Sequence, residues 1–319
     1  MSKNGYVYQR TPSFLGVPIV RTKEELKGYD TVVLGMPWEG SVTWGITTGT
    51  ELATKTIRSA SARYSGYMPE LNINIFDTLK VCDYSDVDIY PGNLEESFRR
   101  FSSRLKNIFE ADAFPIIMGG DHGISYPAIK TLCESTTGKV GIIHFDAHYD
   151  NKPEYEGDKY ARCCPFHNVA DIPNLKTTSM VHLGIRGPRN TQEQAEYAKS
   201  IGATTFTSFD VHRMGIEAVV DEAYKIASDG TEKIYVTVCS DILDVAFNPG
   251  GPPDPNGLTS YELSLALYKL SSYGIHGFDI VEFYPPSDPT NEASHVAAWL
   301  IQYVMAGLAQ RKNNNITLG

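Results

Sequence analysis

Short apolar runs alternate with longer amphipathic runs along this chain. Several short runs, such as TVVLGM (31–36) and KVGIIHF (139–145), are apolar at consecutive positions rather than at every second one. Such strands are buried on both faces, as in a parallel sheet covered by helices on both sides. The sequence therefore predicts a mainly parallel sheet between two helical layers. The predicted strands are 31–36, 114–119, 139–145, 180–185, 203–208, 233–239 and 275–283, and the predicted helices are 94–108 after an Asn93 N-cap, 191–201, 215–229, 259–272 and 294–309.

The size and charge of the chain narrow the class of protein. At 319 residues with 42% hydrophobic content the chain can bury a full core, and we expect one domain over residues 1–319, with its core at about 29–309. The formal charge of −10 repels phosphate backbones and acidic membrane surfaces, which argues against nucleic acid or a membrane as a partner. No apolar run is long enough to cross a bilayer. Five cysteines and a start without an apolar segment predict a cytoplasmic protein in a reducing compartment.

Four predicted strands end in ionisable groups, in the motifs MGGDHGIS, HFDAHYDN, VCSDILD and DIVEFYPP. Functional side chains gather beyond the carboxyl ends of the strands in sheets of this kind. In the second motif Asp146, His148 and Asp150 occupy alternate positions, so in an extended segment they can converge on one point. Neighbouring buried carboxylates repel one another, and a divalent cation relieves that repulsion. Histidine with several carboxylates indicates first-row transition metals, and the carboxylates suffice for two ions.

Structural roles are the alternative for each of these residues. A strand-end aspartate often caps a turn; we assign that role to Asp244 and a capping or supporting role to Asp121. His122 follows Gly119 and Gly120, which allow close backbone approach and favour a functional histidine. Five further histidines lack a partner pattern and are assigned to the core or to structural roles; they are His144, His182, His212, His276 and His295.

The motifs together resemble those of the ureohydrolases, a family that includes arginase, agmatinase and related guanidino-acid hydrolases. GGDHGIS, DAHYDN, DILDVAFNPG and GFDIVEFYPP occur in the family's order over roughly residues 29–309. The resemblance implies a three-layer α/β/α fold with a mainly parallel eight-stranded sheet. It also implies two metal ions, usually manganese and in some members nickel, and a homo-oligomer, either a trimer or a hexamer. In the implied reaction, a hydroxide that bridges the metals attacks a guanidinium carbon and releases urea and an amine.

The resemblance also implies roles for individual residues. The first metal would be held by His122, Asp146 and Asp150. The second would be held by Asp146, His148 and Asp241, with Asp146 bridging the two. Asp150 would also carry a proton to the leaving amine, and Glu282 would pair with the substrate guanidinium.

Three departures from the family pattern concern the metal, the proton and the substrate. Cys239 stands where the family has a metal-bridging aspartate. If its thiolate is a ligand, it favours softer ions, so zinc or iron becomes possible beside manganese and nickel. If Cys239 does not bind metal, the second metal site is weakened. Arg162, in ARCCPF, replaces a shuttling histidine and stays protonated, so it binds a substrate carboxylate, holds a loop or forms a surface ion pair. The adjacent Cys163 and Cys164 are assigned to loop packing. Residues 41–61 lack the family's first arginine and its Gly-Pro, which puts the usual substrates in doubt.

We therefore expect a hydrolase that cleaves a C–N bond of a small guanidine-like or amidine-like cation and releases urea or ammonia. The expected catalytic residues are Asp150 and Glu282, and the expected substrate contacts are Glu282, Arg162 and Asn151. Aromatic residues near the expected mouth favour a flat cation; they are Trp38, Trp44, Tyr149, Tyr155, Tyr160 and Tyr284.

Two other functions stay open. One is a catalytically silent homologue that acts as a partner subunit, and the other is a hydrolase with a thiol nucleophile, Cys239 or Cys164, which needs a histidine base.

Overall fold

The computed structural model describes residues 12–40, 43 and 47–314. Eight strands form one sheet in the order β4-β1-β5-β10-β9-β6-β7-β8, and every pairing in it is parallel. The strands of this sheet are β1 (Thr31–Gly35), β4 (Val81–Asp86), β5 (Phe114–Met118), β6 (Val140–Phe145), β7 (Leu175–Ile185), β8 (Thr204–Thr207), β9 (Lys233–Cys239) and β10 (Gly277–Val281). A separate antiparallel pair consists of β2 (Tyr67–Met68) and β3 (Ile73–Asn74).

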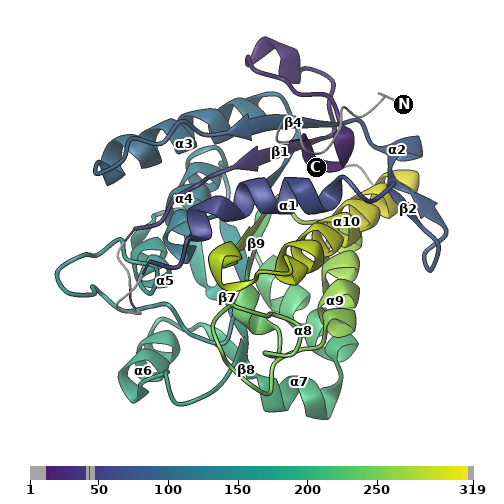
Figure 1. The fold of residues 1–319 in the computed structure, drawn as a ribbon. Helices are drawn as coiled ribbons and strands as arrows, with labels where there is room; N and C mark the ends of the chain where they lie inside the picture. The colour runs from purple at the N-terminus through teal and green to yellow at the C-terminus, as the bar shows by residue number, and fades with distance from the viewer. Residues whose placement is uncertain (1–11, 41–42, 44–46, 315–319) are drawn as a thin grey trace.

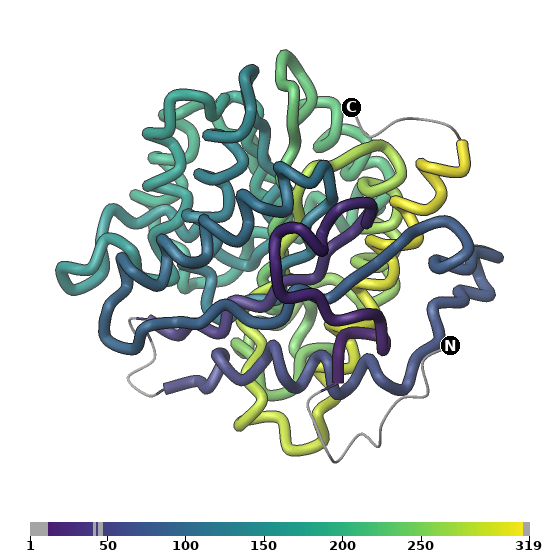
Figure 2. The backbone as a smooth tube through the Cα atoms, turned by 90° about the horizontal axis from the view of Figure 1, so that it is seen from above, coloured from purple at the N-terminus to yellow at the C-terminus, as the bar shows by residue number. Residues whose placement is uncertain are grey.

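Helices cover both faces of the sheet, so the fold has three layers (Figure 1). The helices α1, α8, α9 and α10 pack beside one another on one face, and α3 and α4 pack on the other. Figure 2 shows the same division from above, with the yellow α10 apart from the blue and teal α3 and α4. The α-helices are α1 (Ala53–Ser61), α2 (Ile75–Thr78), α3 (Leu94–Glu110), α4 (Ser125–Glu134), α5 (Pro165–Asn168), α6 (Gln192–Ser200), α7 (Ser208–Met214), α8 (Ile216–Ser228), α9 (Ser260–Tyr273) and α10 (Glu292–Asn313).

The helix α3 illustrates how the sequence builds these layers. The Asn93 side chain accepts a hydrogen bond from the Glu96 amide and caps the helix, as its position predicts. Phe98, Phe101 and Leu105 are buried against the sheet in one of two apolar cores that lie on its opposite faces. The burial of this apolar stripe fixes the helix to the sheet.

All seven predicted strands and all five predicted helices are present, within a few residues of their predicted ends. The elements not predicted from the sequence are β2, β3 and β4 and the helices α1, α2, α4, α5 and α7. β4, with the sequence VCDYSD, is an edge strand whose Asp83 is buried against Arg58 of α1, at 2.8 Å. The strand pattern requires an apolar residue at this buried position, and Asp83, paired with Arg58, takes its place. Parts of the segment 41–61, Trp44 among them, and both chain ends lie outside the described residues.

The parallel arrangement brings the four motif-bearing strands together. β5, β10, β9 and β6 are adjacent in the centre of the sheet, and their carboxyl ends meet at the same edge. The close approach expected of the glycine pair after β5 is present, since a Cβ added to Gly120 would lie 1.8 Å from the Trp38 carbonyl oxygen. None of the helices in the described part of the chain is long and apolar enough to span a membrane.

Candidate functional site

The predicted metal ligands converge at the centre of this edge. Asp146 follows β6 directly and is fully buried. His122 Nδ1 lies 2.9 Å from Asp146 Oδ2 and 3.0 Å from Asp150 Oδ2. His148 Nδ1 lies 3.3 Å from Asp146 Oδ1 and 3.0 Å from Asp241 Oδ2. The ionisable side chains of three of the four motifs therefore form one cluster around Asp146, and the carboxylate of Glu282, from the fourth motif, is paired with Arg162 instead.

This cluster stabilises positive charge. Burial by itself would lower the pKa of both His122 and His148, but the close approach and negative charge of the neighbouring carboxylates outweigh it. The pKa of His148 rises to about 10, and that of His122 rises well above its ordinary value. Burial and the charge of Asp146 raise the pKa of Asp150 to about 6. A group of carboxylates that holds protons on its histidines this strongly is suited to hold cations.

The orientation of His122 fits a metal ligand. Its Nε2 lies 3.0 Å from Thr237 Oγ1, and Thr237 in turn donates to Asp279 Oδ1 at 2.5 Å. This chain fixes the proton on Nε2 and leaves Nδ1 to face the two carboxylates. His122 Nδ1 lies at ion-pair distance from both carboxylates, yet it has no aligned hydrogen bond with any described residue. That geometry is expected when three ligands point at a common position between them.

The described residues provide ligands for more than one ion. Three groups place their ligand atoms within 4.8 Å of one another. They are His122 with His144 and Asp146, Asp146 with Cys239 and Asp241, and His148 with Asp241 and Asp254. Asp146 belongs to two of these groups, and Asp241 also belongs to two. The donor set of imidazole, carboxylate and thiol fits two divalent first-row ions that share ligands.

Cys239 lies within this cluster, at the end of β9. Its side chain is buried, and burial together with the charges of Asp146 and Asp241 holds the pKa of its thiol well above the ordinary value. A neighbouring divalent cation reverses that effect and deprotonates a coordinating thiol. Cys239 is therefore placed to be a ligand, and it is poorly placed to act as a free thiolate nucleophile.

A second set of charged residues forms the neighbouring wall. Arg162 Nη1 donates to Glu282 Oε2 at 2.9 Å, and Arg162 Nη2 donates to Glu39 Oε1 at 3.1 Å. The Tyr284 hydroxyl also donates to Glu282 Oε2, at 2.6 Å. Arg162 is only 5% exposed, so the reading of it as a surface ion pair is wrong. Its guanidinium neutralises the carboxylate that the sequence analysis assigned to the substrate.

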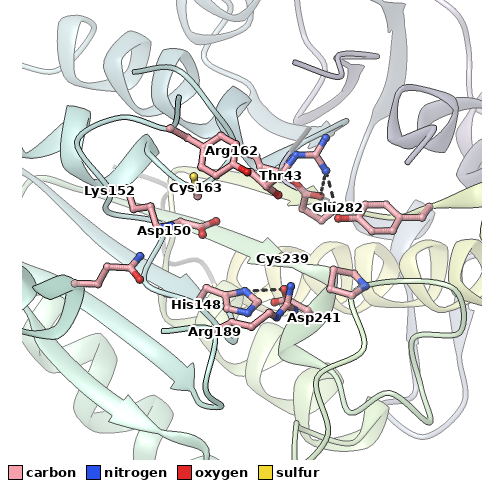
Figure 3. A pocket seen from close by; sticks show the side chains of 14 residues that line it. Thr43, His148, Asp150, Lys152, Arg162, Cys163, Arg189, Cys239, Asp241 and Glu282 are labelled. Atoms are coloured by element: carbon pink, nitrogen blue, oxygen red, sulfur yellow. Dashed lines mark hydrogen bonds and ion pairs between the residues drawn. The ribbon is translucent and has the colours of Figure 1, made fainter. Parts of the chain in front are cut away.

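A cavity of about 240 Å³ opens between the two sets, a size that admits a small molecule. Figure 3 shows the Arg162 guanidinium turned toward Glu282 on one side and His148 paired with Asp241 on the other. The described residues that line the cavity are Thr43, His148, Asp150, Lys152, Tyr155, Arg162, Cys163, Arg189, Gln194, Cys239, Asp241, Pro252, Glu282 and Tyr284.

Some predicted substrate contacts lie behind this wall. Asn151 is buried and donates through Nδ2 to the Gln194 carbonyl at 2.9 Å; it orients a lining residue and does not itself line the cavity. Of the described aromatic residues predicted at the mouth, Tyr155 and Tyr284 line the cavity. Trp38 packs against Phe98 in the core, with ring centroids 5.9 Å apart.

Two site residues have left-handed backbone conformations. Asp150 has a φ of 43° and Glu282 has a φ of 65°. Residues other than glycine rarely adopt this region, and each instance costs on the order of 1–3 kcal/mol. Glu282 directly follows β10 and Asp150 lies in the loop after β6, where the backbone must turn to aim each side chain at the cavity. The turn places Asp150 Oδ2 against His122 and Glu282 against Arg162.

The sequence analysis missed three contributors. His144, assigned to the core, approaches Asp146 Oδ2 with Nε2 at 3.0 Å, and its Nδ1 lies 2.8 Å from His182 Nδ1. Asp254 lies 3.6 Å from His148 Nε2, and Glu39 holds Arg162. A search for alternate residues along β6 could have found His144, which is two positions from Asp146. Asp254 and Glu39 come from loops and leave no local pattern. Asp121 and Asp244 cap turns as predicted, through the amides of Gly123 and Ala246.

Known proteins with this fold and this sequence pattern are hydrolases. The model of the arginase family matches residues 29–307. Proclavaminate amidinohydrolase from Streptomyces clavuligerus is 29% identical over 282 residues, which cover 88% of each chain. Guanidinopropionase from Pseudomonas aeruginosa is 28% identical over 301 residues, covering 94% of this chain and 92% of that one. Formimidoylglutamase from Halalkalibacterium halodurans is 31% identical over 263 residues, covering 81% and 82%.

Solved structures agree with these relatives. The structure of the Streptomyces clavuligerus proclavaminate amidino hydrolase superposes with a TM-score of 0.86 at 26% identity, covering 96% of this chain and all of that one. Formimidoylglutamase from Bacillus subtilis gives a TM-score of 0.85 at 26% identity, covering 97% and 95%. Fold, motif order and the length of the match point the same way: this chain belongs to the arginase family.

Proposed function

We propose that this protein is a metal-dependent hydrolase that cleaves a C–N bond of a small guanidine-like or amidine-like molecule. The observation that carries the proposal is the convergence of His122, Asp146, His148, Asp150 and Asp241 on one buried point, with His122 Nδ1 facing two carboxylates. The names of the relatives support the reaction class, since they are amidinohydrolases and guanidino-acid hydrolases.

The chain offers ligands for two metal ions. His122, Asp146 and Asp150 would hold the first, and Asp146, His148, Cys239 and Asp241 would hold the second. Two such ions supply a hydroxide nucleophile at neutral pH. Carboxylate and imidazole ligands suit manganese or nickel, and the thiol of Cys239 brings zinc and iron into range.

The surrounding residues position the substrate and move the proton. In the net reaction one water adds to the carbon between the nitrogens, a C–O bond forms and a C–N bond breaks. The departing nitrogen gains one proton, which Asp150 carries to it from the water, because Asp150 lies in the cavity wall beside the metal ligands. Glu282 and Tyr284 form the opposite wall and fix the orientation of the reacting group.

Two measurements test the proposal together. Purified protein incubated with manganese, nickel or zinc should contain close to two ions per chain, measured by elemental analysis, and should release urea or ammonia from a panel of guanidines and amidines. Glu282→Gln should keep the metal and lose roughly tenfold or more in substrate affinity, because Gln cannot form the ion pair that holds this wall together. Protein that binds no metal under any condition would contradict the proposal.

A second candidate is a catalytically silent subunit that supports another chain. The observation in its favour is Arg162, which occupies the position on Glu282 that a substrate guanidinium was expected to take. A silent chain would bind no metal and would gain a function only in the presence of a companion protein, so the metal analysis separates the two candidates.

Light scattering on the metal-bound protein tests the further expectation of a trimer or hexamer, and cell fractionation tests the expectation of a cytoplasmic location.

A further inference from the structure

Arg162 changes what the cavity can recognise. Glu282 Oε1 accepts the His122 amide at 2.7 Å, and Oε2 accepts both Arg162 Nη1 at 2.9 Å and the Tyr284 hydroxyl at 2.6 Å. A carboxylate offers about four lone-pair sites, and three are already taken. A guanidinium is recognised by two parallel hydrogen bonds, one to each carboxylate oxygen. Glu282 has no second bond left to give, so it cannot hold a substrate guanidinium in this way while Arg162 stays in place.

Arg162 cannot leave this position without a loss of stability, because carboxylates hold it from both sides. Its other nitrogen, Nη2, donates to Glu39 Oε1 at 3.1 Å, and Asp121 Oδ2 lies 3.9 Å away. Its side chain is 5% exposed. The carboxylates around it outweigh the effect of burial and raise the pKa of Arg162 further above its ordinary value. Breaking one partner of such a buried pair is strongly unfavourable.

The charge on the cavity wall follows from this arrangement. Three lining residues are cations, namely Lys152, Arg162 and Arg189, and three are carboxylates, namely Asp150, Asp241 and Glu282. Asp150 and Asp241 belong to the metal cluster, and Glu282 is neutralised by Arg162. Glu39 lies behind Arg162, where it also accepts the Thr48 and Gly49 amides. Among the described residues of this wall, a cationic substrate therefore finds no carboxylate that is left unpaired.

We propose that Arg162 is a specificity-determining residue that selects uncharged guanidine or amidine derivatives over guanidinium cations. This inference rests on the proposed function and refines the expectation that the substrate is cationic. An acyl, cyano or aromatic substituent lowers the basicity of a guanidine, and the same electron withdrawal makes its central carbon electrophilic without protonation. Such a compound presents lone pairs to the wall. Arg162 lines the cavity and carries only N–H donors, so it matches an uncharged guanidine that accepts hydrogen bonds and does not match a guanidinium, which can only donate them.

The test compares matched neutral and cationic probes on the metal-loaded protein. One pair is cyanoguanidine and guanidinium, and the other is creatinine, a cyclic acylguanidine that is uncharged near neutral pH, and methylguanidinium. Binding is measured by calorimetry, so the result does not depend on turnover. The wild-type protein should bind the neutral member of at least one pair roughly tenfold more tightly than its cation.

Arg162→Gln should reverse the preference, because it keeps hydrogen-bond donors and leaves Glu282 ionised and unpaired. The matched control is Lys152→Gln, which removes one positive charge from the same cavity but leaves the Arg162–Glu282 pair intact, and should shift the ratio much less. Circular dichroism establishes that each variant is folded, and the wild-type comparison stands even if Arg162→Gln does not fold.

Tighter binding of both cations by the wild-type protein would overturn the inference and leave the proposed function standing. An equal shift with Lys152→Gln would also overturn it, since the effect would then be one of total charge. Binding of neither class by protein that carries two ions per chain would overturn the inference as well. Failure of the proposed function has a different signature, which is absence of metal before any probe is added.

Discussion

Two groups of buried carboxylates lie side by side in this protein, and the chain neutralises them in different ways. Around Asp146 the charged partners are His122 and His148, whose positive charge is a bound proton that a metal ion can replace. Around Glu282 the partner is Arg162, whose charge is permanent. The first group is therefore built to exchange its cation with solution, and the second carries its own. On the proposed function, the first group performs the chemistry and the second decides which molecules bind.

The largest expected effect comes from removing Asp146, the centre of the carboxylates that pair with histidines. Asp146→Ala should reduce the metal content from two ions per chain to less than one, because Asp146 is shared between two ligand groups. Hydrolysis should fall by at least about a thousandfold, since the ions supply several kcal/mol of transition-state stabilisation. Elemental analysis and a urea or ammonia assay measure both. Asp244→Ala, at the turn cap three residues after Asp241, is the control that should keep its metal. Normal turnover by Asp146→Ala would refute the metal mechanism.

Removing the permanent cation should mainly affect stability. Arg162→Ala leaves Glu282 and Glu39 buried without their partner, and should lower the free energy of unfolding by about 3–5 kcal/mol. Arg189→Ala is the matched control, because Arg189 is 37% exposed and its pair with Asp254 should contribute only about 1 kcal/mol or less. Urea unfolding measures both. Equal losses in the two variants would show that Arg162 is no more than an ordinary salt-bridge partner.

A smaller effect tests whether the thiol of Cys239 is a metal ligand in the cluster around Asp146. Cys239→Asp should shift the preference from softer ions toward manganese by roughly tenfold in relative affinity. Nickel or cobalt bound to the unaltered protein should give a thiolate-to-metal charge-transfer band that this variant loses. Cys133→Ser, a buried thiol outside the site, should leave the band unchanged. Identical spectra for all three proteins would mean that Cys239 is not a ligand.

The smallest effect concerns the other thiols. Burial raises the pKa of Cys82 and of Cys133 to about 12, so at neutral pH almost none of either is thiolate and both should resist iodoacetamide. Cys163 is partly exposed at the cavity and should react first. Mass spectrometry of the alkylated peptides gives the order. Loss of activity on modification of Cys239, with no dependence on metal, would instead support a thiol nucleophile.

The same contrast explains how much of the molecule could be predicted. The strands and the metal cluster follow local patterns, because consecutive apolar residues and alternating ligands are properties of one short segment. Asp146, His148 and Asp150 illustrate this, and the parallel sheet then brings His122 and Asp241 to them. The edge strand β4 escaped prediction because its buried Asp83 depends on Arg58, 25 residues earlier.

A related reason explains why the pairing of Arg162 with Glu282 and Glu39 could not be predicted from the sequence. Arg162 pairs with Glu282, 120 residues away, and with Glu39, 123 residues away. No spacing rule links residues on three separate loops, so a lone arginine in a polar segment carries the same signal whether it lies at the surface or in the wall of a cavity. Only the assembled fold distinguishes the two.

The left-handed backbone at Asp150 and Glu282 has a consequence for anyone who wishes to engineer this protein. Glycine would relieve the strain at either position, on the order of 1–3 kcal/mol, and would remove the side chain that faces the cavity. Thermal robustness and function therefore pull in opposite directions at Asp150, whose carboxylate a screen for heat tolerance alone would tend to discard. At Glu282 the loss of the buried pair with Arg162 outweighs the relief of strain, so the same screen would keep that carboxylate.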